Sequence, residues 1–187
     1  MYAKMYDEKL AFLDSFEGSV MGRMIGDAKG MKALDIGCGT ARLAPALLAA
    51  GAEVSGIDVS DKMLAVARNK YPWAEFKVGD AEEIPYGDNT FDIVVAAFVL
   101  VHLKDLKRAF REAHRVLKDG GKFIVTNINQ KKPPKLKIGR EEIIIASYYH
   151  IPKHVFLALQ EAGFEVKEDE YIYDRKIWIN QILKAVK

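Results

Sequence analysis

Two glycines and one acidic residue near the start of the chain have the types and spacing needed to bind a nucleoside. A short, mainly apolar segment over 32–36 leads to Gly37 and Gly39, which are separated by one residue. Such glycines let a strand end in a sharp turn and let the backbone approach a ligand where a Cβ would collide. Asp58 ends the next apolar segment, about 20 positions later, where a carboxylate can accept both ribose hydroxyls. The pattern therefore predicts a nucleoside site where two strands end.

Two neighbouring residues narrow the choice of nucleoside. A dinucleotide-binding loop has its third glycine where this chain has Arg42, because the helix must pack closely against the strand beside a pyrophosphate. Asp35 adds a carboxylate two residues before Gly37, where it would repel a pyrophosphate and attract an ammonium group. These features argue against NAD and favour a ligand that carries a ribose and an amino-acid tail.

Four ordered motifs resemble those of a known enzyme family. They are the glycine loop 34–43, Asp58, the segment 79–85 (Gly-Asp-Ala-Glu-Glu-Ile-Pro) and the apolar segment 91–95. Over roughly residues 30 to 130 the chain resembles the class I S-adenosylmethionine-dependent methyltransferases, in particular the small-molecule branch that includes the ubiquinone and menaquinone biosynthesis enzymes. The resemblance implies S-adenosylmethionine as cofactor, S-adenosylhomocysteine as product, and in-line transfer of a methyl group to an oxygen, nitrogen or carbon of a small molecule.

The resemblance also implies which residues hold the cofactor. Asp80 would accept from the exocyclic amine of adenine, the N–H of Ala81 would meet a ring nitrogen, and Tyr6 would cover the cofactor carboxylate. The implied cofactor-binding residues are Tyr6, Asp35, Gly37, Cys38, Gly39, Asp58, Val59, Met63, Asp80, Ala81, Ala97 and Phe98.

Structural roles are the alternatives for several of these residues. Asp35 and Asp80 could cap turns, and Asp58 could be the N-terminal cap of the following helix. Met63 and Phe98 could be core residues. Cys38 is a small residue inside the glycine loop, so we also expect it to be buried as a packing residue.

His102 and Tyr149 are candidates for a catalytic base that accepts a proton from the acceptor. A base of this kind raises a rate by about two to four orders of magnitude. Near-attack geometry alone contributes several kcal/mol, so the reaction does not require one. A structural histidine at the start of a helix is the alternative for His102. We expect no metal site, since Cys38 is the single cysteine and no cluster of oxygen ligands is apparent.

Length and composition agree with a compact, ordinary globular protein of about one domain. The 187 residues are 50% hydrophobic and 29% charged, and the net charge of +2 does not indicate a nucleic-acid or membrane partner. The longest apolar stretch, 93–101, is far shorter than the roughly 20 residues of a membrane helix. Acidic residues near the N-terminus interrupt any signal-peptide pattern. We expect a cytoplasmic protein.

Hydrophobic periodicity predicts alternating strands and helices, the pattern of a parallel sheet with right-handed crossovers. Residues 130–140 break both periodicities and are predicted to be an exposed loop. The predicted strands are 32–36, 53–58, 74–78, 91–97 and 122–128, the predicted helices are 40–50, 61–70, 104–117 and 152–162, and 164–173 with 176–186 form a terminal antiparallel pair. Pro45 fits the first helix only if that helix starts late or tilts.

The fold class is therefore α/β, and the resemblance implies a Rossmann-like sheet of seven mostly parallel strands. Its order would be 3-2-1-4-5-7-6, with the last strand antiparallel and helices on both faces. The single domain 1–187 would comprise a small N-terminal helical lid (1–28), a cofactor-binding core (29–130), a substrate-side insertion (131–151) and a C-terminal helix with two strands (152–187).

Three other functions fit parts of the pattern. An NAD-dependent oxidoreductase would share the strand, loop and helix, and a non-catalytic module would bind S-adenosylmethionine without turnover. The basic run 131–137 keeps an RNA acceptor open. However, residues 96–99 lack the Asn/Asp-Pro-Pro-aromatic signature of enzymes that methylate exocyclic amines in nucleic acids. The small size available to a lid favours a small-molecule acceptor; the sequence assigns neither its identity nor an oligomeric state.

Overall fold

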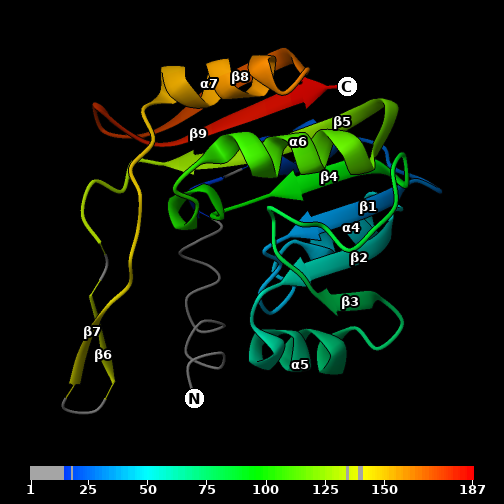
Figure 1. The fold of residues 1–187 in the computed structure, drawn as a ribbon, viewed down its shortest axis with the longest axis horizontal. Helices are drawn as coiled ribbons and strands as arrows, with labels where there is room; N and C mark the ends of the chain where they lie inside the picture. The colour runs from blue at the N-terminus through cyan, green and yellow to red at the C-terminus, as the bar shows by residue number, and fades with distance from the viewer. Residues whose placement is uncertain (1–14, 18, 134, 139–140) are drawn as a thin grey trace.

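The computed structural model describes residues 15–17, 19–133, 135–138 and 141–187. Its main sheet has seven strands in the order β3-β2-β1-β4-β5-β9-β8 (Figure 1). The first five strands in this order pair in parallel, and β9 runs antiparallel to both of its neighbours. This confirms the predicted order 3-2-1-4-5-7-6. The strands are β1 (Lys32–Ile36), β2 (Glu53–Asp58), β3 (Glu75–Val78), β4 (Phe91–Ala96), β5 (Leu117–Ile128), β8 (Glu165–Asp174) and β9 (Ile177–Val186).

Helices cover both faces of this sheet. In β4, Ile93 and Val95 pack on one face with α3, α4 and α5, whereas Val94 and Ala96 pack on the other with α6 and α7. This alternation follows from the period of two along a strand, and burial on both faces explains why β4 is almost continuously apolar. The helices are α3 (Val20–Ile25), α4 (Ala44–Ala49), α5 (Asp61–Lys70), the 3₁₀ turn η1 (Leu100–His102), α6 (Leu106–Val116) and α7 (Pro152–Glu161). None of the described helices is long and apolar enough to cross a membrane.

The first crossover helix is shorter than the predicted 40–50. α4 starts at Ala44, so Pro45 lies in its first turn, where a missing backbone N–H leaves no helical hydrogen bond unmade. The preceding residues form turns, and Ala41 has a φ of +63°. Residues 40–43, which the prediction placed in the helix, instead form part of the glycine loop.

The predicted exposed loop over 130–140 is wrong in its second half. β6 (Lys135–Ile138) pairs antiparallel with β7 (Glu141–Ile144) as a separate two-stranded sheet, which projects from the body of the molecule (Figure 1). The alternation of polar and apolar residues over 135–138 is only four residues long, too short to be distinguished in a segment rich in lysine and proline.

The N-terminal lid is described only in part. Residues 1–14, including Tyr6, lie outside the described residues. The rest of the predicted lid contains α3, whose residues Met21, Met24 and Ile25 are buried against α4 and the sheet.

An aromatic cluster holds α6 and the segment after α7 to the sheet. The Phe123 side chain of β5 is 1% exposed, and its ring centroid lies 5.6 Å from that of Phe110 and 5.2 Å from that of Phe164. We expect Phe123→Ala to lower the free energy of unfolding by about 3–5 kcal/mol, because it removes buried area and leaves a cavity. Urea denaturation measures this change. Trp73→Ala, at a side chain that is 68% exposed, is the control and should change stability by less than about 1 kcal/mol. Equal effects would contradict the assignment of this cluster as core.

Candidate functional site

A cavity of about 910 Å³ opens at the carboxyl ends of β1, β2 and β4. In open α/β sheets, ligands bind at this edge. The cavity brings together ten of the predicted site residues: Gly37, Gly39, Asp58, Val59, Met63, Asp80, Ala81, Ala97, Phe98 and His102. Residues that the sequence did not single out complete its lining: Ser60, Lys62, Ala65, Val66, Gly79, Glu82, Val99, Leu103 and Ile145.

The glycine loop strongly favours glycine at its first position. Gly37 has a φ of +64°, and a Cβ on this residue would lie 2.5 Å from Val99 Cγ2. Gly39 also has a positive φ, of +55°. The loop backbone therefore approaches the cavity and the turn after β4 more closely than a side chain would allow.

Asp58 joins the glycine loop to the start of α5. The N–H of Gly39 donates to Asp58 Oδ2 at 2.9 Å, and the N–H of Ser60 donates to Oδ1 at 2.8 Å. The N-cap of α5 is Ser60, whose Oγ accepts from the N–H of Met63, so Asp58 is not the helix cap that one alternative predicted. A carboxylate has about four acceptor sites, so Asp58 keeps capacity for donors from the cavity.

The loop after β3 brings Asp80 and Ala81 to the same cavity, across from α5. Asp80 Oδ1 accepts from the N–H of Glu82 at 2.9 Å, so this side chain does cap a turn as well as line the cavity. Met63 and Val66 of α5 and the exposed Val59 supply an apolar surface to the cavity. A planar base with polar edges fits a slot of this composition.

A buried group of charges lies beneath the glycine loop. Asp35 is 4% exposed and is not among the residues that line the cavity. Burial raises the pKa of Asp35 to about 7, the carboxylates of Glu17 and Asp58 add to the rise, and Arg42 opposes it. Arg42 itself forms two hydrogen bonds of 2.8 Å with Glu17. Sequence reasoning missed this ion pair, because Arg42 drew attention only as a missing glycine.

Phe98 adopts a backbone conformation that is rare for a bulky residue, with a φ of +60°. Its N–H donates to Thr126 Oγ1 at 2.9 Å, and its ring lies 4.9 Å from the Arg42 guanidinium carbon and 6.2 Å from the Phe16 ring. Phe98 lines both the large cavity and a second, mainly apolar cavity of about 280 Å³ at the ends of β5 and β9. Phe98 therefore separates the two cavities and is not the core residue of the alternative prediction.

The structure separates the two candidate bases. His102 lines the cavity, and burial holds its pKa below the usual range, although Asp58 and the backbone at Ala146 act in the opposite direction. Tyr149 is not among the lining residues, and its ring centroid lies 5.8 Å from Lys131 Nζ. The insertion instead contributes Ile145 to the cavity.

Cys38 is buried and packs beneath the loop. A Cβ on Gly56 would lie 2.8 Å from Cys38 Sγ, so the thiol lies against β2. Burial raises the pKa of this thiol, which keeps it protonated. The geometry agrees with the expected packing role. The described residues contain no group of three or more side chains that could hold a metal ion.

His150 positions the turn that carries His102, and sequence reasoning did not assign it this role. Its Nε2 lies 2.9 Å from the carbonyl oxygen of Leu100 and 2.8 Å from that of Leu103. Because both partners only accept, Nε2 must carry the proton. The N–H of Tyr148 also donates to the carbonyl of Val101, at 2.8 Å. The segment before α7 thus holds both ends of η1.

Known proteins share this fold, and some are similar to part of this sequence. A solved S-adenosylmethionine-dependent methyltransferase from Mesorhizobium loti has a TM-score of 0.76 at 21% identity, covering 92% of this chain and 98% of that one. The PH0226 protein of Pyrococcus horikoshii has a TM-score of 0.77 at 24% identity, covering 94% and 90%. At these identities the likeness concerns the fold. A family model described as a methyltransferase domain matches residues 34–125.

Curated relatives extend the sequence likeness beyond the region that the family model matches. A demethylmenaquinone methyltransferase of Staphylococcus aureus is 38% identical over 146 residues, which are 72% of this chain and 60% of that protein. Over residues 34–125 this chain therefore matches the methyltransferase-domain family, and its sheet has the fold of solved S-adenosylmethionine-dependent methyltransferases. The demethylmenaquinone methyltransferase of Chlorobaculum parvum is 41% identical over 109 residues, which are 57% of this chain. The matched part spans 45% of that relative, so the chain spans about half the length of the curated relatives it matches.

The steric demand at Gly37 predicts the effect of adding a methyl group there. We expect Gly37→Ala to lower the unfolding temperature and to abolish stabilisation by S-adenosylhomocysteine, because the new Cβ meets Val99 and backbone strain of this kind costs about 1–3 kcal/mol. Gly22→Ala in α3, where a Cβ meets nothing within 4 Å, is the matched control and should keep the ligand stabilisation without lowering the unfolding temperature. Thermal unfolding with and without the ligand measures them. Normal ligand stabilisation of Gly37→Ala would refute the close approach.

The buried Asp35 predicts a pH dependence of stability. Its folded-state pKa of about 7 lies above the ordinary 3.8, so the folded protein keeps a proton that the unfolded chain releases over this interval. The contribution of Asp35 to stability is therefore complete at low pH and declines as the pH rises toward 7, by at most about 1.4 kcal/mol per pH unit. Asp35→Asn, which stays neutral, should remove this decline. Denaturant titrations of both proteins across the interval measure the difference, and parallel curves would contradict it.

Proposed function

We propose that this domain binds S-adenosylmethionine in the large cavity and transfers its methyl group to a small-molecule acceptor. The observation that carries the proposal is the Asp58 carboxylate, which lines the cavity between the glycine loop and α5 while two backbone N–H groups hold it in place. A fixed carboxylate at the end of the second strand is suited to accept both hydroxyls of a ribose.

The other cofactor contacts follow from this placement. We assign the adenine to the slot between α5 and the loop after β3, where Val59 and Met63 would pack on its faces and Asp80 and Ala81 would meet its polar edge. The backbone at Gly37 and Gly39 would lie along the ribose and the methionine chain. Asp35 would favour the cofactor ammonium through its charge beneath the loop.

The remaining wall faces the acceptor in this proposal. When bound, S-adenosylmethionine would supply an electrophilic methyl group, which an acceptor nucleophile would take up in line with the breaking carbon–sulfur bond, leaving S-adenosylhomocysteine. Ala97 and Phe98 would flank the sulfonium, and Phe98 would limit where the acceptor can lie. His102, whose lowered pKa keeps the imidazole neutral near pH 7, would accept a proton from an acceptor that must lose one. Tyr6 at the cofactor carboxylate and Tyr149 as a second base stay predictions from the sequence.

The class of acceptor rests on the lining and on the relatives. Val99, Leu103 and Ile145 make the neighbourhood of His102 mainly apolar, which suits a small molecule with little charge. The relatives named above are demethylmenaquinone methyltransferases, and a ring compound with a nucleophilic carbon is the first acceptor to test. A cytoplasmic location and the lack of a nucleic-acid partner also stay predictions from the sequence.

Calorimetry with S-adenosylhomocysteine tests the cofactor site. We expect Asp58→Asn to weaken binding roughly 10- to 100-fold, because hydrogen bonds to a charged group contribute about 1.5–3 kcal/mol. Asp61→Asn is the matched control, since this neighbouring side chain is 72% exposed and pairs with Arg68. Unchanged binding by Asp58→Asn, or tighter binding of NADH than of S-adenosylhomocysteine by the unaltered protein, would refute the proposal. Release of S-adenosylhomocysteine in a screen of ring compounds then identifies the acceptor.

A further inference from the structure

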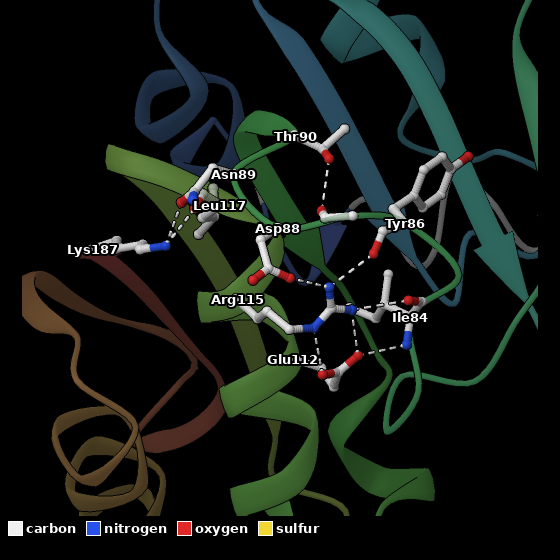
Figure 2. A network of polar contacts seen from close by, with 10 residues as sticks. Ile84, Tyr86, Asp88, Asn89, Thr90, Glu112, Arg115, Leu117 and Lys187 are labelled. Atoms are coloured by element: carbon white, nitrogen blue, oxygen red, sulfur yellow. Dashed lines mark hydrogen bonds and ion pairs between the residues drawn. The ribbon is translucent and has the colours of Figure 1, made fainter.

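The most highly connected polar side chain in Figure 2 lies outside the cavity, on the helix behind the loop that carries Asp80. Arg115 of α6 donates from Nε and Nη2 to the two carboxylate oxygens of Glu112, each at 2.8 Å. Its remaining hydrogens reach the carbonyl oxygens of Ile84 (3.0 Å) and Tyr86 (2.9 Å) and Asp88 Oδ1 (2.8 Å). A guanidinium has five N–H donors, so every donor of Arg115 is engaged.

Glu112 completes a grip on one residue of the loop. Its Oε2 accepts from the N–H of Ile84 at 2.8 Å, while the carbonyl of the same residue accepts from Arg115. Both backbone groups of Ile84 are therefore held by α6. The Ile84 side chain is 3% exposed in the core beside α6, so apolar packing holds it from the same side.

A few contacts within the loop connect Ile84 to the residues that line the cavity. Pro85 lies between Ile84 and Tyr86, and a Cβ on Gly79 would be 2.8 Å from Pro85 Cδ, so the start of the loop packs against its middle. The N–H of Glu83 donates to the carbonyl of Asp80 at 3.1 Å and closes the turn. A shift of Ile84 and Pro85 would therefore displace Asp80 and Ala81, which line the cavity.

The rest of the network fixes where the loop returns to the sheet. The N–H groups of Asn89 and Thr90 donate to the carbonyls of Arg115 and Val116, at 3.0 and 2.8 Å. Lys187 at the end of the chain bridges the Asn89 side chain and the Leu117 carbonyl, each at 2.7 Å (Figure 2). These backbone and Lys187 contacts hold the return without the Arg115 side chain, so substitutions of Arg115 or Glu112 act mainly on the half of the loop nearer the cavity.

We infer that Arg115 and Glu112 are positioning residues that set the base selectivity of the cofactor site, by holding the loop of Asp80 and Ala81 at the distance at which it reads the edge of adenine. The inference rests on the proposed function. Lysine cannot replace Arg115, because an ammonium is a point charge with three donors and cannot span a carboxylate and three further oxygens. Glu112→Gln keeps the shape of the side chain and replaces one accepting oxygen with a donor.

Two ligands that differ only at the base edge test this inference. S-adenosylhomocysteine carries the exocyclic amine, and S-inosylhomocysteine carries a carbonyl oxygen in its place. We expect the unaltered protein to prefer the adenosyl compound. We expect Arg115→Lys and Glu112→Gln each to lower the ratio of the Kd for S-inosylhomocysteine to the Kd for S-adenosylhomocysteine by about tenfold, or about 1.4 kcal/mol. A purely structural role would lower the folded fraction and change both Kd values equally, leaving the ratio unchanged. Arg111→Lys, an exposed arginine of the same helix, is the matched control.

The outcomes separate this inference from the proposed function. Failure of the unaltered protein to bind either compound overturns the proposed function. Binding with normal preference in both variants, with ratios within twofold of the unaltered protein, overturns the role of Arg115 and Glu112 and leaves the proposed function standing. Equal binding of the two compounds by the unaltered protein also overturns the inference, because the loop then does not read the base. If Arg115→Lys does not fold, the isosteric Glu112→Gln decides the matter.

Discussion

The shape of the large cavity depends on the hydrogen bonds between the Asp58 carboxylate and the backbone N–H groups of Gly39 and Ser60. β1 and β2 run in parallel, with Ile36 opposite Ile57, so the loops that follow them leave the sheet side by side. Loops that meet in this way need a polar connection, because each exposes backbone donors that no strand pairs. Asp58 supplies that connection and still faces the cavity. Structural support and ligand binding therefore use the same side chain.

Buried charge beneath the loop imposes a second constraint. Asp35, Arg42 and Glu17 lie in a region of low exposure, where an unbalanced charge is costly. The Arg42–Glu17 pair is neutral as a unit, and Asp35 responds to burial with a raised pKa. Glu17 precedes α3, so this charge group also fastens the described end of the N-terminal segment to the glycine loop. In the proposed function, a cationic amino-acid tail above the loop would balance Asp35 in its ionised form.

Three elements shape the cleft from behind, each by contacts between residues distant in the chain. His150 holds both ends of η1 and so determines where His102 lies. Thr126 of β5 accepts from the strained backbone at Phe98, which fixes the residue that separates the two cavities. Arg115 and Glu112 of α6 hold the loop of Asp80. The rigid helices and strands thus determine the positions of loops that have little regular structure of their own.

The resemblance to a known family supplied the strand order, whereas the sequence by itself determined the parallel sheet, the glycine loop and the place of Asp58 beside the cavity. These features depend on local signals, namely period-two and helical patterns, glycines at required turns and an acid after a strand, and local signals are readable one segment at a time. Only the tertiary structure decided that Ile145, and not Tyr149, is the residue of 131–151 that lines the cavity. It also decided that Phe98 separates two cavities and that Glu17 pairs with Arg42. It likewise revealed the β6–β7 pair and the contacts of His150 and Arg115. Each of these depends on how segments far apart in the chain pack and hydrogen-bond, and the periodicity of one segment carries no record of its distant partner.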